Sequence, residues 1–173
     1  MRIRVFSIFI VGALVMANST NAFRSTFHST FPKCHIEISS PQRLTEGIWL
    51  TFSLNNNTNQ DLLLLPWFTP LEGFMSNLFE ITDLNGNKLL YQVPMIKRMT
   101  PTTDDFVLWK EGTVLSRSLD LTQAYKITSG RYHIQFNAPY VAIRPPVDTS
   151  NAHGASESAY FSCRSEQLMF EVL

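Results

Sequence analysis

The sequence predicts an all-β protein, namely an antiparallel β-sandwich of immunoglobulin-like type with about seven to nine strands. Three observations predict this fold. Short runs of apolar residues alternate with polar ones at period two, which is the spacing of a half-buried strand. Turn residues separate the runs at intervals of about 8–12 residues. No long amphipathic helical pattern and no internal repeat interrupts this rhythm.

The central stretch, residues 62–101, has the densest alternation of strand-like runs and turns. A hairpin is predicted at residues 83–87, because its Asn-Gly pair tolerates the positive φ of a tight turn. The expected arms of this hairpin are a strand at residues 77–82 and a returning strand at residues 88–92. The other predicted strands cover residues 34–39, 48–54, 62–65, 106–109, 113–119, 131–136 and 167–173.

Two connections between strands have their own signals. The polar turn after the second strand contains Asn56-Asn57-Thr58, which fits a glycosylation acceptor in a eukaryotic protein. Residues 120–125 are typical of one helical turn whose N-cap is Asp120.

The N-terminus is typical of an export signal. Arg2 and Arg4 precede an apolar run of 13 residues, and small residues allow cleavage after Ala17 or Ala22. Thirteen residues of helix span only about 20 Å, less than the roughly 30 Å hydrocarbon core, which favours a cleaved signal over a membrane anchor. We therefore expect a signal peptide at residues 1–22, a secreted or periplasmic location, and no membrane association after cleavage.

The remaining chain divides into two parts. Residues 23–33 are polar and aromatic and are predicted to be a linker. Residues 34–173 are predicted to form the β-sandwich domain. Within it, residues 138–159 contain three prolines and a tail of small polar residues, so we expect a long loop there between the last two strands.

The sequence contains two cysteines, Cys34 and Cys163. In an exported protein an even number of cysteines suggests a disulfide. The bond would join the first strand to the start of the last and would contribute roughly 4–5 kcal/mol in the chain-entropy model. The alternatives are two buried thiols and a catalytic cysteine, which would need a histidine and an orienting group beside it.

The sequence gives little sign of catalysis or of a cofactor. It contains none of the motifs HExxH, CxxC, GxSxG, GxGxxG or the P-loop, and its four histidines show no metal-ligand spacing. Asp104 and Asp105 fit a solvated turn better than a calcium site. The formal charge is zero, with 14 basic and 14 acidic residues, so nothing electrostatic favours a nucleic acid. We expect no catalytic, cofactor-binding or metal-binding residues, and no enzymatic activity.

Residues 65–73 read Leu-Pro-Trp-Phe-Thr-Pro-Leu-Glu-Gly. This string resembles the W-x-TPLEG segment in the N-terminal pro-domain of deuterolysin-type zinc peptidases, the peptidyl-lysine metalloendopeptidase family. Further similar segments follow in the same order over residues 34–138, at 76–81 (SN-x-F-x-V), 91–98 (Y-x-G-x-x-x-KR) and 119–132 (DL-x-x-AY…G-x-Y). Two features depart from the pattern. Val93 replaces a glycine, and the chain ends where the catalytic domain of the family would begin.

The resemblance implies a pro-domain-like protein without the catalytic domain. Such a protein would be an exported, non-enzymatic binding protein that inhibits or chaperones a secreted zinc peptidase. The alternative is an envelope or extracellular adhesion module that displays loops on a β-sandwich. The residues that would contact a partner are Phe68, Thr69, Pro70, Leu71, Glu72, Gly73, Lys97 and Arg98.

The same residues also allow purely structural roles. Trp67 and Phe68 fit packing in the core or between the sheets better than a binding anchor. The segment ending in Gly73 fits a structured turn in which the glycine adopts positive φ. Glu72 could form an ion pair with Lys97 or Arg98 that braces two loops.

Overall fold

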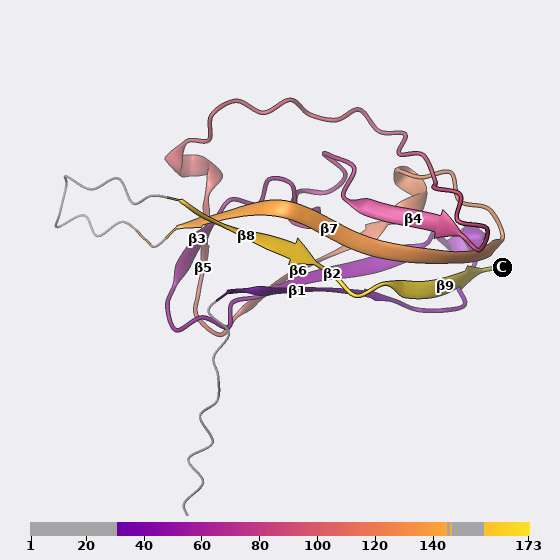
Figure 1. The fold of residues 1–173 in the computed structure, drawn as a ribbon, viewed down its shortest axis with the longest axis horizontal. Helices are drawn as coiled ribbons and strands as arrows, with labels where there is room; N and C mark the ends of the chain where they lie inside the picture. Colours follow the sequence, from indigo (N-terminus) through magenta and orange to yellow (C-terminus); the bar gives the residue numbers. More distant parts are fainter. Residues whose placement is uncertain (1–30, 145, 147–157) are drawn as a thin grey trace, which may run out of the picture.

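The computed structural model describes residues 31–144, 146 and 158–173. The predicted signal peptide and most of the predicted linker lie outside the described residues. Within these ranges nine strands form two antiparallel sheets, connected by turns and short 3₁₀ helices (Figure 1). No helix in the described ranges is long and apolar enough to cross a membrane. The structure therefore confirms the prediction of an all-β fold built from two sheets.

The smaller sheet contains three strands in the order β1-β2-β6. Period-two alternation in the sequence explains which faces are buried: Leu50, Phe52 and Leu54 point into the core, while the residues between them face outward. Leu50 pairs with Ile38 of β1 and Leu119 of β6, so the three strands share one inner face. The strands are β1 (Lys33–Ile38), β2 (Trp49–Asn55) and β6 (Val114–Asp120).

The larger sheet is organised around one long strand, β7 (Gly130–Arg144). One edge of β7 pairs with β4 and then with β3, and the other edge pairs with β9 and then with β8. The short strand β5 extends the sheet beyond β3. These five strands are β3 (Leu62–Leu64), β4 (Phe79–Asp83), β5 (Val107–Trp109), β8 (Ala159–Arg164) and β9 (Leu168–Val172).

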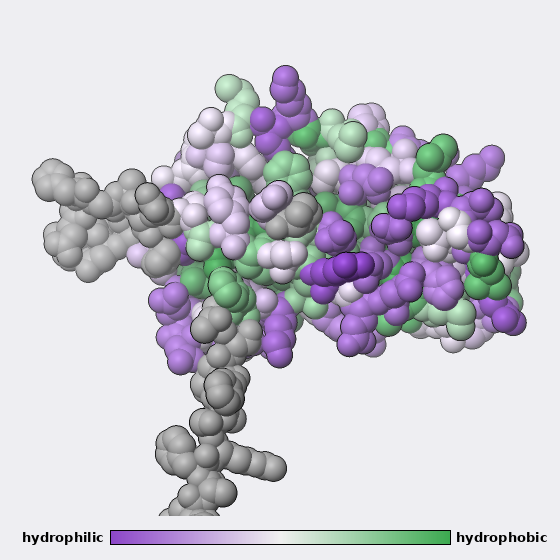
Figure 2. Space-filling view, in the orientation of Figure 1, coloured by the Kyte–Doolittle hydropathy of each residue, from purple (hydrophilic) through white to green (hydrophobic). Residues whose placement is uncertain are grey.

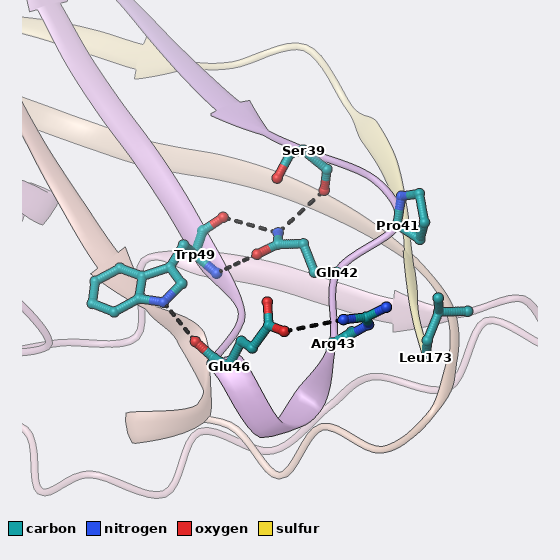
Figure 3. A pocket seen from close by; sticks show the side chains of 8 residues that line it. Ser39, Pro41, Gln42, Arg43, Glu46, Trp49 and Leu173 are labelled. Atoms are coloured by element: carbon teal, nitrogen blue, oxygen red, sulfur yellow. Dashed lines mark hydrogen bonds and ion pairs between the residues drawn. The ribbon is translucent and has the colours of Figure 1, made fainter.

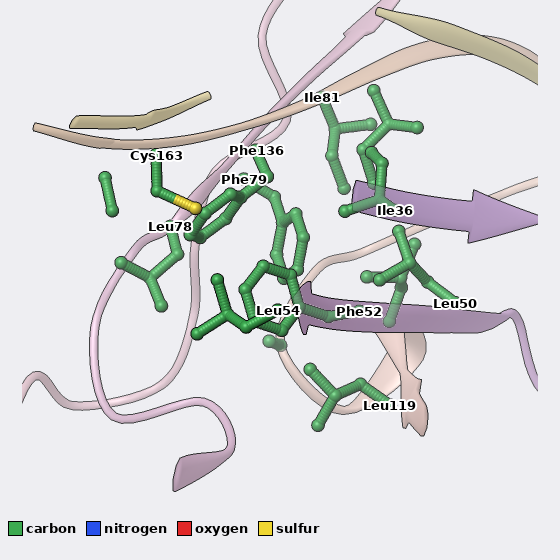
Figure 4. Close-up of a cluster of buried hydrophobic side chains, with 14 of the residues drawn as sticks. Ile36, Leu50, Phe52, Leu54, Leu78, Phe79, Ile81, Leu119, Phe136 and Cys163 are labelled. Atoms are coloured by element: carbon green, nitrogen blue, oxygen red, sulfur yellow. The ribbon is translucent and has the colours of Figure 1, made fainter. Parts of the chain in front are cut away.

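The two sheets enclose a core of aliphatic and aromatic side chains (Figure 4). Phe52 of the smaller sheet meets Phe136 of β7 edge to face, with ring centroids 4.8 Å apart. Beside them the disulfide between Cys34 and Cys163 joins β1 to β8, with Cα atoms 5.7 Å apart. The predicted disulfide is thus confirmed, and it ties one sheet to the other.

The predicted loop at residues 138–159 is wrong for residues 138–144 and 159, which lie in strands. Strand β7 continues to Arg144 and pairs with β8, which begins at Ala159. The register shifts between Ala138 and Val141, so Pro139 lies at a β-bulge, one of the few places in a sheet that tolerate proline. Residues 145 and 147–157 of the predicted loop lie outside the described residues.

The predicted returning strand at residues 88–92 is also wrong. The hairpin turn itself is present, since Gly86 has φ +84° and the Asp83 amide donates to the Asn87 carbonyl (3.0 Å). After an isolated bridge at Lys88, however, the chain leaves β4. Tyr91 bridges instead to Tyr125, next to the 3₁₀ turn η4 (Leu121–Gln123). That turn is capped by Asp120, as predicted.

Candidate functional site

The connection between β3 and β4 folds around a short capped turn, η2 (Pro70–Glu72). The Thr69 hydroxyl donates to the Pro66 carbonyl (2.6 Å) and accepts from the Leu71 amide (3.3 Å). Gly73 ends the turn with φ +89°, a backbone conformation that residues other than glycine rarely adopt. The Thr-Pro-Leu-Glu-Gly string is therefore a structured turn, as its composition predicts.

Glu72 connects this turn to the segment that carries Arg98. One carboxylate oxygen of Glu72 accepts from the Phe68 amide (3.0 Å), and the other is ion-paired with the Arg98 guanidinium. The guanidinium carbon of Arg98 also lies 5.0 Å from the centre of the Trp67 ring, within cation–π range. The predicted ion pair is confirmed for Arg98, and Lys97 stays exposed. We call Trp67, Glu72 and Arg98 the loop brace.

The Glu72 side chain is only 12% exposed. Burial raises the pKa of its carboxyl above the ordinary value because the charged form loses contact with water. The Phe68 amide and the Arg98 guanidinium lower the pKa and only partly offset that effect. A glutamate with a raised pKa favours folding most when it is protonated, so its contribution to stability is lost as pH rises through the folded-state pKa.

The Glu72→Gln variant, which cannot titrate at this position, tests that sign. As pH rises from about 4 to 7, the unfolding free energy of wild type should fall relative to that of the variant. Glu80→Gln serves as the control, because the Lys88 side chain lowers the pKa of Glu80. The unfolding free energy of wild type should therefore rise with pH relative to that of Glu80→Gln. Urea titrations at several pH values measure both differences. A wild-type advantage over Glu72→Gln that grows with pH would contradict this account.

An open groove of about 570 Å³ lies beside the loop brace. Its walls come from the β3–β4 connection, from the segment around Met95 and Met99, and from β7 and β8. Large side chains are exposed along it, with Met99 89% and Tyr140 70% accessible. Figure 2 shows hydrophobic side chains reaching the surface among hydrophilic ones. The exposed large residues that line the groove are Phe68, Met95, Met99, Tyr140 and Tyr160.

The predicted contact residues divide into three classes by exposure. Phe68 and Lys97 are exposed, and Leu71, Glu72 and Arg98 are partly buried. Thr69, Pro70 and Gly73 are buried, which corrects the expectation that the whole turn faces a partner. The hydroxyl of Thr69 is occupied in capping, and Gly73 lies against the Arg117 guanidinium.

The sequence-based prediction missed Tyr140 and Tyr160. Tyr140 falls in the stretch that was predicted to be a loop, and Tyr160 follows that stretch directly, where no strand was predicted, so neither exposed tyrosine carried a signal. The apolar run Val141-Ala142-Ile143, which is buried throughout, was the available signal that a strand continues past Pro139 and carries Tyr140 on it.

A second pocket, of about 580 Å³, lies where Trp49 faces the turn at residues 41–47 (Figure 3). The Gln42 amide nitrogen donates to the carbonyls of Ser39 and Trp49, and its oxygen accepts from the Trp49 amide. The Trp49 indole donates to the Glu46 carbonyl (3.0 Å). Because these polar groups already form hydrogen bonds with one another, they are not available to a ligand, and the groove is the better candidate for a binding site.

Within the described ranges, no three His, Cys, Asp or Glu side chains gather closely enough to hold a metal ion. Asp105 instead accepts from the amide and the hydroxyl of Thr102, which caps a 3₁₀ turn.

Comparison with known proteins finds no family model that matches, but it does find a distant relative. The relative is an extracellular protease of Aeromonas hydrophila, 26% identical over 132 residues. The match covers 73% of this chain but only 38% of the relative. The chain is therefore distantly similar to part of an extracellular protease, and this similarity and the disulfide both fit an exported protein.

Proposed function

We propose that this protein is an exported, non-enzymatic binding protein that inhibits or chaperones a secreted zinc peptidase of deuterolysin type. One observation carries the proposal: most of the chain is similar to a minor part of an extracellular protease. The resemblance at residues 65–73 points to the same class of protein and to its pro-domain. Secretion or periplasmic location through a signal peptide at residues 1–22 is part of this proposal.

The proposal assigns hydrolysis to the partner and not to this chain. The 173 residues contain no His-Glu-x-x-His motif, which supplies two zinc ligands and the general base in zinc peptidases. What the chain offers is a surface. Protein interfaces gain most of their affinity from a few large anchors at a well-packed centre, and the groove presents Met99, Tyr140 and Tyr160 together.

The loop brace gives this surface its shape. Trp67 and Arg98 both line the groove, and Glu72 holds Arg98 to the β3–β4 connection. Because these side chains are held before a partner arrives, little ordering entropy is lost on binding. Lys97, exposed beside Arg98, is available at the rim.

An inhibition assay tests the proposal. The purified protein should slow a deuterolysin-type zinc peptidase in a saturable manner, should not be consumed, and should itself hydrolyse no protein substrate. Refolding of the denatured peptidase with and without the protein separates a chaperone from an inhibitor. If neither hydrolysis nor refolding changes, the proposal fails and an adhesion module becomes the better account.

We also propose that the sandwich is immunoglobulin-like. The orders β1-β2-β6 and β8-β7-β3-β5 match strands A-B-E and G-F-C of that fold, with β5 beside strand C. A crystal structure in which β6 pairs with a strand other than β2 would overturn this assignment.

A further inference from the structure

One edge of β7 is only partly covered by other strands. On that edge β4 pairs with residues from Tyr132 to Phe136, and β3 pairs with Ile143 and Arg144. Two more hydrogen bonds extend the pairing, from the Asn137 amide to Leu78 and from Leu65 to the Ala142 carbonyl. Among the described strands, none pairs on this edge with residues 138–141. The larger sheet therefore has a gap between β4 and β3.

The groove lies at this gap. Leu65 and Leu78, which line it, are the residues immediately beyond β3 and β4. The uncovered part of β7 contributes Ala138 and Tyr140. At about 3.3 Å per residue, four uncovered positions correspond to roughly 13 Å of extended chain. The space therefore suits three or four residues of an added strand.

The bulge in β7 turns polar backbone groups toward the gap. Strand residues alternate in the edge to which their N–H and C=O point. The backbone groups of Asn137 and Ala142 both form hydrogen bonds on the edge of β7 where the gap lies. The register shift between these two residues means that Tyr140, two residues before Ala142, points its backbone groups to the same edge as Ala142. The N–H and C=O of Tyr140 thus face the gap, and its side chain lies on the exposed face together with Tyr160, which is opposite Ala142.

The charge of the groove limits what can fill it. Arg98 is the one charged residue among the described residues that line it, and Glu72 neutralises it. A charged side chain placed there would lose its water without gaining a counter-charge, which is costly. The complementary occupant is an uncharged segment with apolar side chains.

We propose that an extended, uncharged apolar segment of the partner peptidase adds to β7 in the gap between β4 and β3, antiparallel to β7. The peptidase as occupant rests on the proposed function. The peptidase is favoured over a second copy of this chain because of the relative. In that protease, more than half of the polypeptide lies outside the part that matches this chain, so the matched part is covalently joined to the remainder of a protease. The backbone of Tyr140 provides hydrogen bonds, and Met99, Tyr140 and Tyr160 hold the side chains.

A blocked tetrapeptide, acetyl-Leu-Thr-Leu-Thr-amide, is the probe for strand addition. It should bind the full chain and slow hydrogen exchange at the Tyr140 amide. The same peptide with N-methylated amides keeps its apolar surface but cannot form the backbone bonds, so it should bind about tenfold more weakly for each bond lost. A peptide with aspartate in place of one leucine should also bind more weakly. Equal binding of the N-methylated peptide, or no binding by the parent peptide, would overturn the proposal.

A matched pair of methionines connects this surface to the peptidase. Met99→Asp places a charge at the groove, whereas Met169→Asp places one on β9, and both residues are exposed. We expect Met99→Asp to weaken peptidase inhibition at least tenfold and Met169→Asp to leave it unchanged, with both variants as stable as wild type. If wild type inhibits and Met99→Asp inhibits equally well, the groove proposal fails while the proposed function stands. If the tetrapeptide binds but no peptidase is inhibited, the strand-binding gap stands and the peptidase as its occupant is overturned.

Discussion

Removal of the disulfide is expected to lower the free energy of unfolding by about 4–5 kcal/mol. Cys34 and Cys163 are 129 residues apart in sequence, so the bond closes most of the domain into one loop and restricts the unfolded chain strongly. The double variant Cys34→Ala/Cys163→Ala should therefore unfold at a much lower urea concentration than wild type. The native packing of β1 against β8 should persist below that concentration.

Peptide mapping by mass spectrometry provides the control. Without reductant, wild type should yield the cross-linked peptide that contains both cysteines, and reduced wild type should lose about as much stability as the double variant. A loss below about 1 kcal/mol would mean that the unfolded chain is already restricted in some other way. Two free thiols in the exported protein would contradict the disulfide itself.

Asn56→Ala is expected to cost about 2–4 kcal/mol, because it leaves buried polar groups without partners. The Asn56 side chain is fully buried and makes four hydrogen bonds. Its amide nitrogen donates to the carbonyls of Gln60 and Trp109, and its oxygen accepts from the amide and hydroxyl of Thr58. It thereby ties the end of β2 to β5.

The neighbouring Asn59 is exposed and supplies the control. Asn59→Ala should change the free energy of unfolding by less than about 0.5 kcal/mol. Thermal and urea unfolding of both variants measure the difference. Equal stability of the two variants would show that water can replace the bonds of Asn56. The same geometry makes the Asn56-Asn57-Thr58 pattern a structural turn, whose amide nitrogen is not accessible to a glycosyl group in the folded protein.

The fold could be predicted from sequence wherever one face of a strand is buried and the other is exposed to solvent. Alternation of that kind marks β1 and β2 directly. It also marks the first half of β7, predicted as residues 131–136, but it fails in the second half, because the register shift after Ala138 inverts which residues point inward and the prolines that follow are typical of a loop. It fails at residues 88–92 because Tyr91 pairs across the molecule with Tyr125, a contact that local sequence does not encode.

The candidate site was predictable only in part, for a related reason. The ion pair of Glu72 and Arg98 could be anticipated, because both residues lie in turn segments and carry opposite charges. The groove could not, since it combines residues from β7 and β8 with side chains of the segment around Met99. Such a surface exists only when distant strands are aligned, and its position depends on the bulge.

Hydrogen exchange of this protein mixed with a catalytically inactivated deuterolysin-type zinc peptidase tests the central claim most directly. We expect slower exchange at residues 94–101 and 138–143, which border the groove. Residues 168–172 of β9, on the opposite edge of β7, should show no change. Protection confined to β9, or no protection anywhere at peptidase concentrations that saturate inhibition, would contradict that claim.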